Sequence, residues 1–520
     1  MKRAASQAAD NAVRKLPQGS DALEATEWQA LDLALAEFAA SGTAEVREDG
    51  EWLADLAAFQ YELKTEGRDP VVHLWSDARN LTRRIVSIRE QSSQRVVLDV
   101  RKFGRAKPVK LEFLRRDSAR PENRVSREQF RARFERILAE RFPDAIVDSL
   151  TASPDLEHSF SGIYVRGVMH EGPRAWALLA ASSEETAASI EGMLAFGLIW
   201  LDWARSHSAK RAIEGLRLFV PAGGAASISE KLPGISTGSA RVEIFEMVGH
   251  DAEMRRVPTS DAGNLKSWLV PRRDVEAALT RAQDAFGRIR AMWPNPAAQI
   301  ELRPSPDAKE VAFCFKGLAF ARWTREGVLF GLGNAQKPLT EKSERALEKI
   351  LHQLDLHRNA EARDVNHWMF RASPERWLES MAIQEPTRLD AQLDQRFFYS
   401  QVPALTANGR GIVDLLGITR QGRLVVIELK AKEDIQLPLQ AIDYWLRVRR
   451  HQLQNDFHAE GYFIGAEIDS RPPLVWLVAS GFQFHPSTAT LLKYLSPEIQ
   501  ITKIGLNEKW RSGIKVLFRQ

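Results

Sequence analysis

The chain has 520 residues, of which 44% are hydrophobic and 27% charged, and its formal net charge is +4. A chain of this length exceeds one ordinary core, so about three domains are expected, and the composition is that of a globular protein. The small charge allows a polyanionic partner but does not by itself indicate one.

The only cysteine, Cys314, excludes a disulfide framework and fits a reducing cytoplasm. It lies in the apolar run 311–315, where it is typical of a small core residue rather than a nucleophile. Residues 1–18 include basic side chains but no apolar segment of the kind that a secretory signal needs. The most apolar helix, 190–203, carries two acidic residues and is too short to cross a bilayer. We therefore expect a cytoplasmic protein without a membrane partner.

Residues 1–20 are expected to form a flexible tail, and residues 21–120 a helical region with a small β-structure. The spacing of apolar residues in 21–66 predicts acidic amphipathic helices. Two strand-like runs, 95–100 and 109–114, follow and are joined by a turn-rich segment.

The stretch from 101 to 136 is the most basic in the chain, with thirteen Lys or Arg residues against five Asp or Glu. It fits two interpretations, a solvated surface or a patch that contacts phosphate groups. Under the second interpretation, the residues expected to contact nucleic acid are Arg101, Lys102, Arg105 and Lys107.

Residues 121–225 are expected to form an α/β domain, and residues 226–365 a mixed α/β middle region. The first helix of the domain begins at Ser126, which forms a capping box with Gln129. Three strands, a long helix and a fourth strand follow, which gives the order α-β-β-β-α-β. These elements are expected at 145–150, 161–169, 175–181, 184–206 and 216–221.

Residues 366–520 repeat this order of elements. A helix begins after the N-cap residue Ser373, with Pro374 in its first position. The remaining elements are strands at 398–405, 411–419 and 423–431, a helix at 437–455, and strands at 461–466 and 474–480.

The strand 424–430 carries two charged residues among aliphatic ones. Side chains alternate between faces along a strand, so Glu428 and Lys430 share a face with Val426. Both faces are apolar, as in a central strand that is covered on both sides. A charge there is costly unless it is paired, solvated or bound to a metal. The preceding strand repeats the anomaly with Asp414.

The hairpin between these strands decides whether the carboxylates meet. If residues 420–422 form a three-residue loop with Gly422 in the left-handed conformation, Asp414 lies opposite Glu428, with Cβ atoms about 5 Å apart. A two-residue turn would pair Asp414 with Leu429 and separate the carboxylates. Gln-Gly is a poor two-residue turn, so we prefer the three-residue loop.

This pattern resembles the PD-(D/E)XK nuclease superfamily. Asp414 ends the run GIVD, and thirteen residues separate it from the E-L-K run of Glu428 and Lys430. The proline of the family signature is absent, because Val413 precedes Asp414. The resemblance covers residues 366–520 and implies a restriction-endonuclease-like core around a central mixed sheet.

A second motif follows on the next helix. Gln440 and Tyr444 are similar to the QxxxY motif of RecB-type nucleases in this superfamily, and the resemblance makes them catalytic candidates. On a helix they form one stripe with Arg447 and His451. We expect this stripe to face the metal site and the phosphate backbone, with ordinary helix packing as the alternative.

The resemblance implies that Asp414 and Glu428 bind Mg²⁺, with the Leu429 carbonyl as a further ligand and Mn²⁺ able to substitute. The metal would polarise the scissile phosphate and lower the pKa of a bound water. Lys430 would orient or deprotonate that water. Glu379, on the preceding helix, is a further catalytic candidate, with a plain surface position as the alternative.

Residues 126–221 share the element order of residues 373–466, which suggests a degenerate copy kept for DNA binding or dimerisation. Aligning the two runs places Val165 at the position of Asp414. The aligned strand of the copy has only small residues where the glutamate and lysine stand. The alternative is coincidence, because this order of elements is common.

We therefore expect a multidomain α/β protein whose C-terminal domain is a magnesium-dependent DNA endonuclease in repair or defence. DNA is the expected partner, and RNA is compatible with the same chemistry. A homo-oligomer is compatible with the suggestion that residues 126–221 are kept for dimerisation. Two alternatives stay open, a catalytically inactive module that binds nucleic acid and a scaffold or sensor with a nuclease-like C-terminal domain. The chain has no P-loop sequence and no zinc-ligand spacing.

Overall fold

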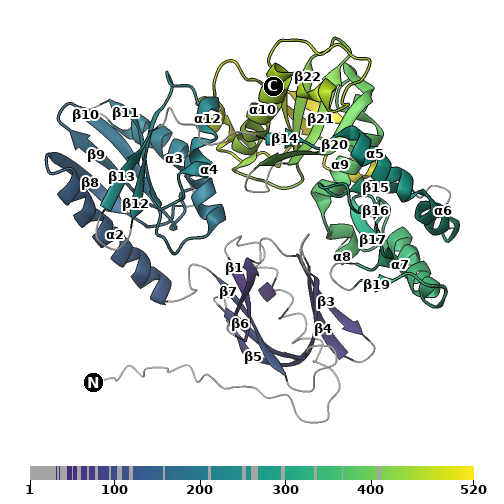
Figure 1. The fold of residues 1–520 in the computed structure, drawn as a ribbon. Coiled ribbons are helices and arrows are strands. Elements are labelled where there is room, and N and C mark those ends of the chain that lie inside the picture. Colours follow the sequence, from purple (N-terminus) through teal and green to yellow (C-terminus); the bar gives the residue numbers. More distant parts are fainter. Residues whose placement is uncertain are drawn as a thin grey trace, which may run out of the picture. The chain divides into compact units, whose positions relative to one another are not determined.

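The computed structural model describes residues 31–520 apart from short internal segments, the longest of which are 36–43, 102–107, 116–120, 259–266 and 407–411. The protein is a mixed α/β protein with several sheets (Figure 1). The expected tail lies outside the described residues.

The chain divides into two compact units, and each is built from two separate segments. Unit 1 joins residues 1–124 to 329–373, and unit 2 joins residues 125–328 to 374–520. The expected middle region, 226–365, is therefore shared between the units.

Unit 1 is built on a seven-stranded antiparallel sheet with the order β2-β1-β7-β6-β5-β4-β3. Two of its strands, β6 and β7, confirm the two strands expected after residue 92. The strands are β1 (Ala44–Glu48), β2 (Glu51–Asp55), β3 (Gln60–Glu66), β4 (Asp69–Trp75), β5 (Asn80–Gln91), β6 (Arg95–Arg101) and β7 (Val109–Arg115). The second segment adds η3 (Glu341–Ser343), α7 (Glu344–His357), α8 (Trp368–Arg371) and β19 (Lys337–Pro338), which pairs with β18 (Gly327–Phe330).

The prediction of helices throughout 21–66 is wrong from residue 44 onward, because three strands lie there. Ala44 and Val46 are both buried and lie two positions apart, which is the period of a strand. Asp49 takes a left-handed φ of 52° and turns the chain into β2. Its carboxylate accepts a hydrogen bond from the Lys110 amide, a partner far away in the sequence. The pairing with β7 therefore makes this segment a strand, although its acidic residues also fit the solvated face of a helix.

The N-terminal lobe of unit 2, which runs from α2 to β13, has a six-stranded sheet with the order β13-β12-β11-β10-β9-β8. The pairs β10–β11 and β11–β12 are parallel, and the other three pairs are antiparallel. The elements are α2 (Pro121–Arg141), β8 (Ala145–Thr151), β9 (Val165–Glu171), β10 (Arg174–Ala180), α3 (Ala187–His207), β11 (Ile213–Pro221), α4 (Ala226–Ser229), η2 (Leu232–Gly234), β12 (Arg241–Val248) and β13 (Glu253–Val257).

The predicted order α-β-β-β-α-β is present in this lobe, but its first helix starts earlier than expected. The helix begins at Pro121 rather than after Ser126. Proline is favoured at the first position of a helix, where its missing N–H would have no partner. Ser126 therefore lies inside the helix and is not its cap.

Helix α3 is the most apolar helix of the described residues. It extends from Ala187 to His207, beyond the expected 190–203, so the prediction that it is too short to cross a membrane is wrong. By length and composition alone it could cross a membrane, but 61% of its apolar window is buried inside the protein. Thr186 caps its start by accepting a hydrogen bond from the Ser189 amide at 3.2 Å. The helix is apolar because it packs in the hydrophobic core that the two lobes of unit 2 share.

The C-terminal lobe, which runs from α9 to β25, has a seven-stranded sheet with the order β14-β20-β21-β22-β23-β24-β25. The pairs β22–β23 and β23–β24 are parallel, and the others are antiparallel. Its elements are α9 (Pro374–Gln384), η4 (Pro386–Arg388), β20 (Leu393–Thr406), β21 (Ile412–Thr419), β22 (Leu424–Lys430), α10 (Leu437–Gln454), α11 (Asp456–Ala459), β23 (Leu474–Ser480), α12 (Thr488–Leu492), β24 (Gln500–Leu506), η5 (Trp510–Ser512) and β25 (Val516–Arg519). Strand β14 (Ser267–Leu269) joins its edge from the middle of the chain.

The strand predicted at 461–466 is wrong, since this segment is a turn. Gly461, Phe463 and Gly465 all have left-handed φ values, which a strand does not allow. The apolar residues Tyr462 and Phe463 are nevertheless buried in a cluster with β21 and β22. The apolar run that predicted a strand is therefore explained by the burial of a turn.

A small antiparallel sheet lies against the start of α9. It contains β15 (Ile300–Pro304), β16 (Val311–Phe315) and β17 (Leu318–Thr324), and it follows α5 (Arg272–Arg281) and α6 (Gln283–Ala291). The turn between β16 and β17 holds Gly317, where a Cβ would lie 2.3 Å from the Arg376 carbonyl oxygen. Cys314 in β16 is buried, as predicted.

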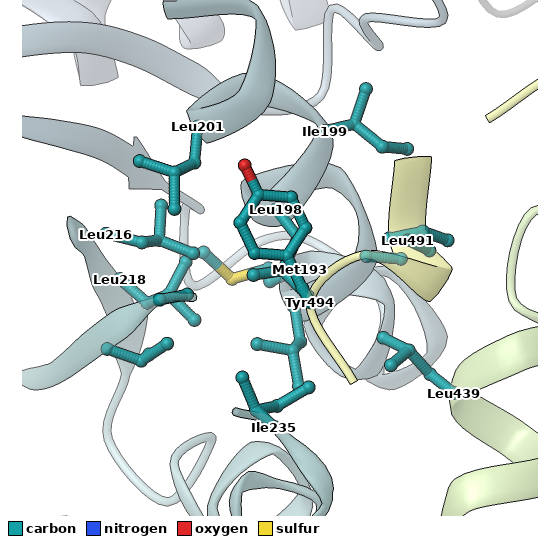
Figure 2. Packing of buried hydrophobic residues seen from close by; sticks show 14 of the residues in the cluster. Met193, Leu198, Ile199, Leu201, Leu216, Leu218, Ile235, Leu439, Leu491 and Tyr494 are labelled. Carbon is teal, nitrogen blue, oxygen red and sulfur yellow. The ribbon is translucent and has the colours of Figure 1, made fainter. Parts of the chain in front are cut away.

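The two lobes of unit 2 share one hydrophobic core. Helix α3 contributes Met193 and Leu198, and α10 contributes Leu439. Figure 2 shows Tyr494, which follows α12 of the C-terminal lobe, among the side chains of α3 and β11. Its hydroxyl lies 3.1 Å from an oxygen of Asp202 in α3. The lobes are therefore joined through buried side chains rather than by a linker alone.

Candidate active site

The hairpin β21–β22 has the three-residue loop that the sequence predicts. The Thr419 amide donates to the Arg423 carbonyl at 2.8 Å, and Gly422 has a φ of +86°. A Cβ at Gly422 would lie 2.4 Å from the Glu467 carbonyl oxygen, so both conformation and space require glycine there. The register pairs Leu415 with Ile427, so the next residues along the two strands, Asp414 and Glu428, face each other.

Glu428 is buried in the hairpin with little to neutralise its charge. Its side chain is 1% exposed, and its Oε2 has no hydrogen-bond partner. Burial and then the nearby charge of Asp414 raise the pKa of Glu428 well above its ordinary value. Asp414 itself is only half-buried, so this end of the pair is open to solvent.

Lys430 lies between two carboxylates. Its Nζ is 3.4 Å from Glu428 Oε1 and 3.4 Å from Asp434 Oδ2. Burial lowers the pKa of Lys430, but the charges of Glu428 and Asp434 outweigh it and raise the pKa above its ordinary value. The lysine therefore carries its positive charge at the edge of the acid pair. Asp434 follows Lys430 by four residues, in the loop between β22 and α10.

Gln401 of β20 completes the polar surroundings of Asp414. Its Nε2 donates to Asp414 Oδ1 at 3.3 Å. The ladder between β20 and β21 pairs Ser400 with Leu415 and Val402 with Val413, which places Gln401 opposite Asp414. Gln401 has a left-handed φ of 50°, an uncommon conformation for this residue. The sequence analysis missed Gln401, since nothing local sets it apart.

Glu379 is buried rather than on the surface. Its side chain is 4% exposed, and Oε2 accepts a hydrogen bond from Arg376 at 2.9 Å and lies 3.5 Å from Arg303 of β15. Its Oε1 has no hydrogen-bond partner. Burial raises the pKa of Glu379, and the two arginines oppose this, while the charge of Asp414 adds to it. Glu379 thus lies within electrostatic reach of the acid pair, and the small β15–β17 sheet supplies one of its partners.

Tyr444, in the first half of the α10 stripe, lies within electrostatic reach of the acid pair. Burial and then the charges of Glu428 and Asp414 raise the pKa of the Tyr444 hydroxyl above its ordinary value. Gln440, one turn earlier, is half-buried, and its Oε1 has no hydrogen-bond partner.

The second half of the stripe does not fit the expected contact with phosphate. Arg447 is 6% exposed, and its Nη2 is 2.9 Å from Asp443 and 3.2 Å from Glu230. His451 is 1% exposed, with Nδ1 2.7 Å from Asp456. Both side chains are buried, and each contacts acidic residues within the protein. The stripe turns inward because α10 packs against the N-terminal lobe as well as its own sheet.

The basic patch expected in 101–136 can be traced only in part. Arg101, at the end of β6, is half-buried and pairs with Arg84 across the sheet of unit 1. Lys102, Arg105 and Lys107 lie outside the described residues.

Asp414 and Glu428 are the candidate ligands of a divalent cation. In the described parts of the chain, no group of three or more His, Cys, Asp or Glu residues is placed to hold a metal. Asp414 and Glu428 supply a facing pair of carboxylates, and hard cations take such oxygens together with several waters. The unpartnered Oε2 of Glu428 is a buried acceptor that a cation would satisfy. The pair therefore fits a cation that keeps much of its water, and Leu429, buried between Glu428 and Lys430, offers only its backbone.

No family model and no curated protein matches this chain.

Proposed function

We propose that the C-terminal lobe hydrolyses phosphodiester bonds in DNA, as a magnesium-dependent nuclease. The observation that carries this proposal is the facing pair on adjacent strands, half-buried Asp414 and buried Glu428, with Lys430 beside Glu428. Burial and the charge of Asp414 raise the pKa of Glu428, and a buried carboxylate destabilises the fold unless it is paired or bound to a cation. Such clusters of perturbed acids are more frequent at functional sites than elsewhere.

The arrangement of the lobe supports the same proposal. Its elements follow the order α9, β20, β21, β22, α10, β23, with an antiparallel hairpin that continues into parallel strands. We infer that this is a restriction-endonuclease-like core. The acid pair lies on the hairpin at its centre, and Tyr444 of the second motif lies within electrostatic reach of it.

In this proposal, Asp414 and Glu428 hold the cation, and Gln401 orients the Asp414 carboxylate through its hydrogen bond. The bound Mg²⁺ would polarise the phosphate and lower the pKa of a water, with Mn²⁺ able to substitute. Lys430 keeps its proton beside the carboxylates and offsets the negative charge that develops on the phosphate. Tyr444 lies within electrostatic reach of the pair, and we expect Gln440, one turn earlier on α10, to lie on the same side.

The first experiment is a nicking assay on supercoiled plasmid in Mg²⁺, in Mn²⁺ and with EDTA. Glu428→Gln and Lys430→Met keep the size of each side chain but remove its charge. We expect cutting to need the metal and to fall at least about 100-fold in each variant, the scale of losing a group that stabilises the transition state. Glu433→Gln, an exposed acid on the following loop, is the matched control and should cut like the wild type.

Other results would point to the alternatives. DNA that is retained on a gel but not cut by the wild type favours a nucleic-acid-binding module without catalysis. Cutting that survives both substitutions places the chemistry elsewhere. A chain that neither binds nor cuts DNA or RNA favours a scaffold or sensor.

A further inference from the structure

Six of the seven strands in the C-terminal lobe repeat the six-stranded sheet of the N-terminal lobe, and β14 is an additional edge strand. In each lobe an antiparallel three-stranded meander continues into two parallel strands and ends in an antiparallel edge strand. A long helix, α3 or α10, follows the third strand of each meander, and a helix, α2 or α9, precedes its first strand. Coincidence explains a shared order of elements, but it does not explain the same six-strand order with the same directions.

The lobes also contact each other as the halves of a symmetric dimer would. Ile235, before β12, forms an antiparallel bridge with Leu495, before β24. The Ser236 amide donates to the Tyr494 carbonyl, and the Ser496 amide donates to the Gly234 carbonyl, each at 2.8 Å. Each lobe therefore offers the same segment to the other, which is the property of a two-fold interface. Helices α3 and α10 contribute to the core that this interface encloses.

The register of the strands shows which residues of the N-terminal lobe stand at the positions of the acid pair. Gly215 pairs with the first residue of β12, as Leu474 pairs with the first residue of β24. Their partners on the preceding strands are Trp176 and Val425. Trp176 of β10 therefore corresponds to Val425 of β22, and the residues that follow them correspond one by one.

On this count, Leu179 stands where Glu428 stands, and Ala181 stands where Lys430 stands. Leu179 pairs across the hairpin with Arg166, which therefore takes the position of Asp414. The sequence alignment that placed Val165 there is wrong by one residue.

The faces of the sheet confirm this correction. Val165 is buried with Phe134 and Leu138 of α2, on the face away from α3. Leu179 is buried on the face that packs against α3, the counterpart of the face where Glu428 lies near α10.

The N-terminal lobe cannot hold a cation at this position. Arg166 is buried at 6% exposure, and its guanidinium lies over the rings of Phe160 and Trp200, 4.8 and 5.7 Å from their centroids. Its Nη2 donates to the Ser153 carbonyl at 2.7 Å. A fixed positive charge replaces one carboxylate, and the leucine replaces the other.

We propose that the chain is an internal dimer with one cutting centre, and that it makes a single-strand break in duplex DNA at each binding event. This inference rests on the proposed nuclease function of the C-terminal lobe. A symmetric homodimer with two centres can cut both strands, because each centre meets one strand. Here the N-terminal lobe occupies the place of the second subunit, and its centre has lost both carboxylates and the lysine.

The test follows the products of the full-length protein on supercoiled plasmid with Mg²⁺. Open-circular DNA should form first and convert nearly all of the substrate, with linear DNA appearing only after this phase. The reaction is repeated with a several-fold excess of the Glu428→Gln variant, which retains the shape of the site but lacks its charge. The ratio of linear to open-circular product should not change.

Two results would overturn the inference. Linear DNA that forms together with open-circular DNA from the start, and that disappears when the Glu428→Gln variant is in excess, would show that two chains pair their centres. That result leaves the nuclease itself intact. Absence of any metal-dependent cutting by the wild type would overturn the proposed function and this inference with it.

Discussion

Glu428 is the residue on which the proposed chemistry depends most, and its surroundings explain why. It lies on a central strand with aliphatic neighbours, and Lys430 is the cation that contacts it among the described residues. The sequence predicted this placement, because strand alternation and the length of one hairpin loop are local properties. The partners of Glu379 and Asp414 could not be predicted in the same way, since Arg303 and Gln401 come from other strands.

The contact of Gln401 with Asp414 leads to a prediction at this scale. Gln401→Ala removes a hydrogen bond that orients a proposed metal ligand, and loss of such supporting contacts costs about 10- to 100-fold in metal affinity or activity. We expect a higher Mg²⁺ concentration for half-maximal nicking and weaker Mn²⁺ binding by electron paramagnetic resonance. Gln395→Ala, an exposed glutamine on the same strand, is the control. Unchanged Mn²⁺ binding in Gln401→Ala would remove Gln401 from the site.

Helix α10 shows how an element can be predicted correctly and its role only in part. Its extent from 437 to 455 agrees with the structure, where Asn455 ends it with a left-handed φ of 59°. Its stripe of polar residues was also visible in the sequence. The stripe divides, however, because Tyr444 lies near the acid pair while Arg447 pairs with Glu230 of the N-terminal lobe.

The buried end of α10 predicts a dependence of stability on pH. Burial lowers the pKa of His451 below its ordinary value of 6.5, although Asp456 opposes the shift and Arg450 and Arg447 add to it. Below about pH 6.5 the unfolded chain binds a proton at this histidine that the folded chain resists, so the free energy of unfolding falls as the pH is lowered. The contribution is constant above that pH.

Urea unfolding at pH 7.5 and at pH 5.5 measures this effect. The loss of stability between the two values should be smaller in His451→Gln than in the wild type. His207→Gln, an exposed histidine on α3, should lose as much as the wild type. An equal loss in His451→Gln and the wild type would contradict the assignment.

At the scale of the whole molecule, the shared core of unit 2 is the decisive feature. Helix α3 has an apolar pattern all round because both its own sheet and the C-terminal lobe cover it. The same pattern read alone also fits a membrane span. The interface thus explains the composition of α3 and joins the two lobes through one core.

This core predicts that the two lobes lose structure together. Leu198 is fully buried in it, and Leu198→Ala should lower the free energy of unfolding by about 2–5 kcal/mol. Hydrogen exchange followed by mass spectrometry should show reduced protection in β11 and in β23 alike. Leu453→Ala, on the exposed face of α10, should leave both unchanged, since this side chain is 69% exposed. Loss of protection confined to β11 would mean that the lobes fold independently.

The sequence by itself determined the local parts of this protein, namely the strand that carries Glu428 and Lys430, the loop that sets Asp414 against it, and the span of α10. These follow from alternation, turn chemistry and periodicity over a few residues. Only the tertiary structure decided that Arg447 and His451 are buried, that Arg166 rather than Val165 pairs with Leu179 across the hairpin, and that the two lobes share one hydrophobic core. Those features depend on contacts between segments far apart in the chain, which local patterns do not record.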